Sequence, residues 1–101
     1  MIWEAIAEVV GTAFFFSVIL SYGISPLAVA IGLLAAIYAF GKVSGGNFNP
    51  AVSFLMYVKG DMDLTKFLVY VIAQLIGAML ALLWWKYTIG MKKGGNSIVS
   101  I

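Results

Sequence analysis

A polar, glycine-rich stretch from Ser44 to Ser53 stands out in an otherwise apolar chain. Lipid tolerates irregular backbone only where protein buries it or where it lines a water-filled cavity. Asn49-Pro50 at the centre of the stretch is typical of a helix start, because asparagine is a favoured N-cap and proline fits the first helical position. The stretch therefore predicts a re-entrant loop and half-helix over residues 44–57, with Lys59-Gly60-Asp61 ending the helix.

The chemistry of such a half-helix lies in its first turn. From Pro50 to Tyr57 it would be ~12 Å long, under half of the ~30 Å hydrocarbon layer. Its leading amides lack intrahelical partners and the helix dipole adds about half a positive charge, so this end attracts dipoles and repels cations. One half-helix forms only one wall of a passage. Two that enter from opposite faces would meet near the midplane with their Asn49 side chains adjacent, as in the inverted repeats of transport proteins.

Two other polar side chains, Glu8 and Gln74, fall inside apolar spans. A charge at the bilayer centre costs at least ~2.5 kcal/mol on insertion scales, so Glu8 needs partners. Free amides around Gly45 to Phe48 would donate to its carboxylate, and Gln74 would serve the same loop. We therefore expect Glu8 and Gln74 to be structural anchors of the loop. The alternative is that Glu8 lies close enough to the interface to reach water.

The remaining composition argues against catalysis. The chain has no cysteine and no histidine, and no second carboxylate in the apolar spans forms an acid–base pair with Glu8. The sequence contains no nucleophile–base pair, metal-ligand cluster or phosphate-binding loop. We expect no enzyme activity, no metal site and no cofactor. All six basic residues are lysines, and they form no basic stripe, which argues against nucleic acid as a partner.

Three apolar spans surround the polar stretch. With 63% hydrophobic and 10% charged residues, the composition is typical of a membrane protein. The spans cover about 5–22, 26–41 and 65–85, and each approaches the ~20 residues that cross a bilayer. Ser25 and Asp63 are the expected N-caps of the second and third spans.

These elements define the predicted fold. It is all-α, with three transmembrane helices and one re-entrant half-helix forming a single repeat over residues 1–88. A polar, flexible tail follows over residues 89–101. The predicted location is the lipid bilayer of the cell membrane, as a multi-pass integral protein.

Small residues recur at four-residue spacing in all three spans. The stripes are Ala7 and Gly11; Ala28, Gly32 and Ala36; and Ala73, Gly77 and Ala81. In a bilayer such stripes let helix backbones approach closely, which supplies packing where hydrophobicity cannot. We predict close packing of the three spans, against the simpler interpretation that alanine and glycine are merely abundant.

The lysines are divided evenly between the two ends of the predicted spans. Three fall on the side of the amino terminus and three on the other: Lys42, Lys59 and Lys66, then Lys86, Lys92 and Lys93. Lysine bias near span ends sets orientation in the membrane, and this distribution gives no bias. An even split also arises by chance, but it is what an antiparallel homodimer with dual topology requires.

Three motifs in order give the chain a resemblance to a known family. They are Glu8 with Gly11-Thr12, the stretch Ser44–Ser53, and Ala73-Gln74-Leu75-Ile76-Gly77-Ala78. Up to about Tyr87 the chain resembles the amino-terminal half of an aquaporin, a major intrinsic protein. The second half, with its own Asn-Pro-Ala loop, is missing. The resemblance implies one aquaporin-type repeat that pairs antiparallel with a second copy as a passive channel for water and small neutral solutes such as glycerol.

The same resemblance implies roles for the loop residues. The Asn49 side chain would cap the half-helix through its oxygen and donate its amide NH₂ to a passing water or polyol, in single file and with cations rejected. Pro50 and Ala51 would shape the tight turn. The carbonyl oxygens that line the pore would come from Gly45, Gly46 and Asn47.

Three positions depart from the family pattern. Asn47 stands where the family often has histidine, which alters a common link between the loop and the first helix. Val52 occupies the place of a filter arginine, and the chain contains no arginine. Val29 falls where a bulky filter aromatic often lies. A filter made from two copies is therefore expected to be aliphatic and wide.

Other assemblies are compatible with the sequence. Four antiparallel pairs would give a particle of eight chains. Alternatively, this half pairs with a different half-sized partner or serves as an accessory subunit of a full-length channel, although a strong lysine asymmetry that would favour this is absent. A third alternative is a fragment that folds without conducting.

Overall fold

The structure, a computed structural model, describes residues 1–91, and all regular structure in that range is helical. It contains α1 (Ile2–Tyr22), α2 (Pro26–Ser44), α3 (Pro50–Lys59) and α4 (Leu64–Trp85), and a π-helical turn, η1 (Lys86–Gly90), continues α4. The predicted all-α class is confirmed. The flexible tail was predicted over residues 89–101. Residues 89 and 90 belong to η1, and residues 92–101 lie outside the described part of the chain.

The starts of α2, α3 and α4 follow from local capping. Ser25 Oγ accepts from the Ala28 amide, Asn49 Oδ1 from the Ala51 amide and Asp63 Oδ1 from the Lys66 amide. Proline at the first position of α2 and of α3 has no amide donor to satisfy. All three predicted N-caps are confirmed.

Two glycines in the left-handed region end α2 and α3. Gly45 has φ 89° and its amide donates to the Gly41 carbonyl, while Gly60 has φ 98° and donates to Met56 and Tyr57. Only glycine adopts such a φ without steric cost, which is why it commonly ends helices. α2 therefore continues three residues beyond the predicted end at residue 41, and α3 two residues beyond 57.

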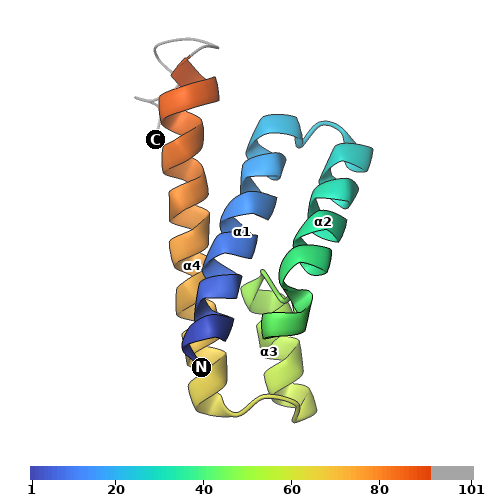
Figure 1. Ribbon diagram of the computed structural model, residues 1–101, viewed down its shortest axis with the longest axis vertical. Helices are drawn as coiled ribbons and strands as arrows, with labels where there is room; N and C mark the ends of the chain where they lie inside the picture. Colours follow the sequence, from blue (N-terminus) through green and yellow to red (C-terminus); the bar gives the residue numbers. More distant parts are fainter. Residues whose placement is uncertain (92–101) are drawn as a thin grey trace.

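α1 lies between α4 and α2 and packs extensively against both (Figure 1). The small residues make this packing close. A Cβ on Gly77 of α4 would lie 2.6 Å from the Val9 carbonyl oxygen of α1, and one on Gly32 of α2 would lie 2.9 Å from a Val18 methyl of α1. The predicted close packing of the spans is confirmed, and the stripes are used inside the chain.

α3 is a half-length helix that begins at depth and returns toward the end of the molecule at which α1 begins (Figure 1). Its ten residues rise ~15 Å, half of a bilayer core. Phe67 of α4 holds its far end, with ring centroids 6.3 Å from Phe54 and 5.1 Å from Tyr57. Among the described residues no helix continues the line of α3 through the other half of the repeat.

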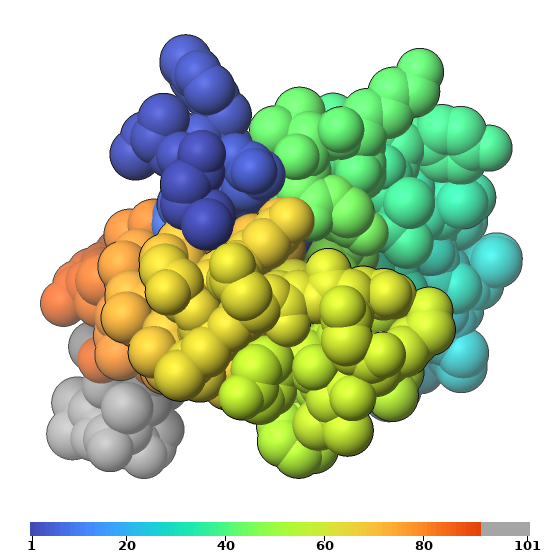
Figure 2. All heavy atoms as spheres, turned by 90° about the horizontal axis from the view of Figure 1, so that it is seen from below, coloured from blue at the N-terminus to red at the C-terminus, as the bar shows by residue number. Residues whose placement is uncertain are grey.

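Four helix ends gather at one face of the molecule. Figure 2 shows this face, with the start of α1, the end of α2, α3 and the start of α4 around it. Lys42, Lys59 and Lys66 belong to those helix ends, whereas Lys86 lies at the opposite end of α4. Lys92 and Lys93 lie outside the described residues.

Candidate functional site: the re-entrant loop

The Glu8 carboxylate is fully buried and organises the loop between α2 and α3. Its Oε2 accepts from Ser44 Oγ at 2.6 Å and from the Asn47 amide at 3.1 Å. Its Oε1 accepts from the Phe48 amide and from Gln74 Nε2, both at 2.8 Å. Four neutral donors thus hydrogen-bond both carboxylate oxygens, which stabilises the buried group. The interpretation of Glu8 as an interfacial, water-reaching residue is wrong.

Three residues of the loop have a positive φ, and one of them is not glycine. Gly45 and Gly46 have φ 89° and 65°, and Phe48 has φ 55°. A non-glycine residue in this region is strained by ~1–2 kcal/mol. Phe48 is held there because its amide donates to Glu8 and its ring is fully buried against Gly11, where a Cβ would come within 2.1 Å of the ring.

Ser53 is the second centre of hydrogen bonding behind the loop. Its buried Oγ accepts from Asn47 Nδ2 at 2.9 Å and from Gln74 Nε2 at 2.7 Å. Asn47, the departure from the family pattern, thus links the loop to α3 through its side chain and to Glu8 of α1 through its backbone amide. Gln74 joins the two centres, because its NH₂ donates to both Glu8 and Ser53.

Sequence reasoning missed three side chains that form hydrogen bonds in this cluster. They are Tyr70, which donates its hydroxyl to the Ser44 carbonyl, and Ser44 and Ser53. It anticipated a loop amide such as that of Phe48 as a donor to Glu8 but not the packing of the Phe48 ring, although Gly11 belongs to a small-residue stripe and leaves room for it. The serines and the tyrosine are ordinary residues for their elements, and their roles depend on contacts made across 21 to 36 positions of the chain.

Asn49 lies at the surface, outside this buried cluster. Its side chain is exposed, its Oδ1 is used by the cap, and its NH₂ has no hydrogen-bond partner among the described residues. Ala51 and Gly45 are exposed as well, and Pro50, Gly46 and Val52 are half-buried. Val29 is not brought to this site. It lies in the first turn of α2, whose helical rise separates it from Gly45 by ~24 Å.

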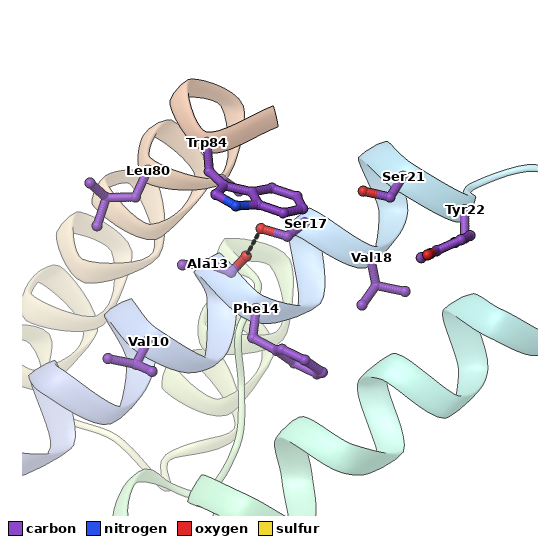
Figure 3. A pocket seen from close by; sticks show the side chains of 10 residues that line it. Val10, Ala13, Phe14, Ser17, Val18, Ser21, Tyr22, Leu80 and Trp84 are labelled. Carbon is purple, nitrogen blue, oxygen red and sulfur yellow. Dashed lines mark hydrogen bonds between the residues drawn. The ribbon is translucent and has the colours of Figure 1, made fainter. Parts of the chain in front are cut away.

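A surface hollow lies away from Asn49. It is a groove of about 540 Å³ along α1 and α4, lined by Val10, Ala13, Phe14, Ser17, Val18, Ser21, Tyr22, Leu80, Ala81 and Trp84 (Figure 3). Its lining is almost wholly apolar, and the Ser17 hydroxyl donates to the Ala13 carbonyl of its own helix. Neither this groove nor the smaller hollow beside Lys42 includes Asn49.

Three described helices are long and apolar enough to cross a membrane, and a fourth element enters and returns to the same face. This arrangement defines an integral membrane protein with a re-entrant loop. Residues 1–100 match the family model described as Major intrinsic protein, and the chain belongs to that family.

Curated relatives agree with the family. The chain is 44% identical over 66 residues to Aquaporin TIP1-2 of Zea mays, which covers 65% of the chain and 26% of that protein. It is 44% identical over 55 residues to Glycerol uptake facilitator protein-like 6 of Lactiplantibacillus plantarum, covering 54% and 26%. It is 41% identical over 64 residues to Aquaporin Z of Photorhabdus laumondii, covering 61% and 28%. The matched part thus spans about a quarter of each relative. No solved structure matches the chain.

Proposed function

We propose that two copies of this chain pair in opposite orientations and form a passive channel for water and small neutral solutes such as glycerol. Family membership and relatives named as aquaporins and as a glycerol uptake facilitator support the transport class. The observation that carries the proposal is the exposed Asn49 NH₂ at the start of a half-length helix, backed by a fully buried polar cluster.

Membrane physics explains why this site needs a second chain. Unpaired polar groups in hydrocarbon cost several kcal/mol each, so irregular backbone is tolerated only against protein or a water-filled cavity. α3 spans only half of the repeat's depth, and residues 1–91 of one chain provide one such helix. An inverted copy supplies a second α3 from the opposite face and encloses water between the two Asn49 side chains. The carbonyls near Gly45, Gly46 and Asn47 then line the path beside Pro50 and Ala51.

The same inversion accounts for the separation of Val29 from Val52. Within one chain, Val29 lies at the end of α2 that is remote from the loop. In an inverted pair, the α3 of the second copy enters from that remote side. Val29 of one copy and Val52 of the other then share one half of the passage. We propose that they form an aliphatic constriction, wide enough to discriminate weakly between water and glycerol.

Stopped-flow swelling of vesicles that contain only the purified chain tests this function. We expect faster swelling than in empty vesicles, under a water gradient and under a glycerol gradient. Asn49→Leu, which removes the donor and the cap, should abolish the gain, whereas Thr65→Ala, an exposed position in the first turn of α4, should retain it. Swelling at the rate of empty vesicles would instead support the fragment interpretation, or a different half-sized partner if a second protein restores it.

The number of pairs in a particle is a separate question. We propose the pair as the functional unit and leave four pairs as the larger alternative. Native mass measurement in detergent distinguishes two chains from eight. Either result is compatible with conduction, whereas a conducting monomer would contradict the pairing.

A further inference from the structure

Ser53 lies at the point where three elements meet behind the half-helix. It is buried, it belongs to α3, and its Oγ accepts one donor from the loop and one from α4. Its amide donates to the Asn49 carbonyl at 3.1 Å and so closes the first backbone hydrogen bond of α3. Ser53 and Asn49 are thus joined by one helical turn, with Ser53 inside the protein and Asn49 at the surface.

The aromatic contacts of α3 lie beyond its first turn. Phe54 and Tyr57 pack against Phe67 toward the far end of the helix. These rings fix the middle and the far end of α3. Two hydrogen bonds to the Ser53 side chain, one from Asn47 and one from Gln74, fix the first turn directly, because both donors are themselves buried.

We propose that Ser53 is a positioning residue, which sets the direction in which the Asn49 NH₂ points. It does not contact the Asn49 side chain, whose oxygen is bonded to the Ala51 amide. It acts through the backbone turn that connects the two residues. The consequence for permeability rests on the proposed function, whereas the consequence for the orientation of Asn49 does not.

Substitutions at Ser53 separate this role from general stability. Ser53→Ala strands two buried N–H donors, which carries a large desolvation penalty unless α3 moves to relieve it. Ser53→Thr keeps the hydroxyl. Ser17→Ala is the matched control, because the Ser17 hydroxyl bonds only the carbonyl one turn earlier in α1. All variants are compared as the full chain in lipid vesicles or nanodiscs.

Selective ¹⁵N-asparagine labelling provides the direct readout, because the chain contains only three asparagines, at 47, 49 and 96. The Asn49 side-chain signal is assigned by its loss in Asn49→Asp. We expect this signal to shift in Ser53→Ala, to return toward the wild-type position in Ser53→Thr and to be unchanged in Ser17→Ala. Water permeability should fall roughly fivefold in Ser53→Ala, the effect of one net hydrogen bond, and recover in Ser53→Thr.

Two results would overturn the proposal: a wild-type Asn49 signal in folded Ser53→Ala, or a Ser53→Thr variant that resembles Ser53→Ala. If Ser53→Ala does not fold, Asn47→Ala provides the test, because it removes one donor to Ser53 and leaves no buried donor without an acceptor. A shifted Asn49 signal in Asn47→Ala supports the positioning role, and an unshifted signal rejects it. If the wild-type chain does not conduct, the proposed function fails, but the Asn49 signal still tests the positioning role.

Discussion

At the scale of single residues, the molecule depends on one buried charge. Glu8 accepts four hydrogen bonds from the loop, from Ser44 and from Gln74. Hydrogen bonds to a charged group are worth about twice those between neutral groups, and an unpaired buried donor is costly. The carboxylate therefore fixes the loop backbone. It also fixes the side-chain amide of Gln74, which donates to Ser53 as well.

Glu8→Gln should destabilise the fold by roughly 2–4 kcal/mol, because the charge is lost and one oxygen is replaced by an NH₂ that faces other donors. Unfolding in mixed micelles, followed by helical circular dichroism, measures this. Glu4→Gln is the matched control: it removes only a partly exposed ion pair with the N-terminal ammonium in the first turn of α1, so it should shift the unfolding curve far less than Glu8→Gln. Equal effects of the two substitutions would mean that Glu8 does not anchor the loop.

Gly11→Ala tests the packing of the Phe48 ring against α1. The new Cβ would lie 2.1 Å from the ring, so Phe48 must shift and take the strained loop backbone with it. We expect a loss of ~1–3 kcal/mol in the free energy of unfolding, as for other overpacked cores, together with reduced water permeability. Gly41→Ala is the control, because its nearest neighbour is an Ile37 methyl at 3.4 Å; a destabilisation as large as that of Gly11→Ala would argue against specific overpacking.

At the scale of elements, the sequence is most informative where structure is local. Ser25, Asn49 and Asp63 were predictable as N-caps because a cap acts within three residues. The pairing of Glu8 with loop amides was predictable because a buried charge restricts its own partners. The use of Ser53 as an acceptor was not, since it depends on a contact between α3 and α4 across 21 positions of the chain. The π-helical turn η1 that continues α4 was not predicted either.

Asn49→Asp tests the electrostatics of the half-helix. A carboxylate is an equally good cap, so α3 should persist, but a negative charge at its positive end should weaken the exclusion of cations. We expect helical circular dichroism to match the wild type and Na⁺ flux into vesicles to rise. Asp63→Asn, at the N-cap of α4, makes the reverse exchange away from the half-helix and should leave Na⁺ flux unchanged. Unaltered Na⁺ flux in Asn49→Asp would place Asn49 outside the conduction path.

At the scale of the whole molecule, charge decides how the chain inserts. Lys42, Lys59 and Lys66 belong to the end at which α1 starts, and Lys86 to the other. The sequence-based prediction assigns Lys92 and Lys93 to that other side as well, which gives three lysines on each, and positive charges near span ends set orientation. Without such a bias we expect the chain to insert both ways, which would supply both members of the proposed inverted pair from one sequence.

Added lysines should therefore separate the two orientations. Trp3→Lys with Thr65→Lys biases the end at which α1 starts, and Ile24→Lys with Tyr87→Lys biases the other; all four positions are exposed. Each double variant alone should insert in one orientation and show no conduction, while the two expressed together should conduct. Because the chain has no cysteine, a single Asp61→Cys, at an exposed position in the turn between α3 and α4, reports orientation when it is labelled with a membrane-impermeant maleimide. Wild-type conduction by one variant in a verified single orientation would contradict antiparallel pairing.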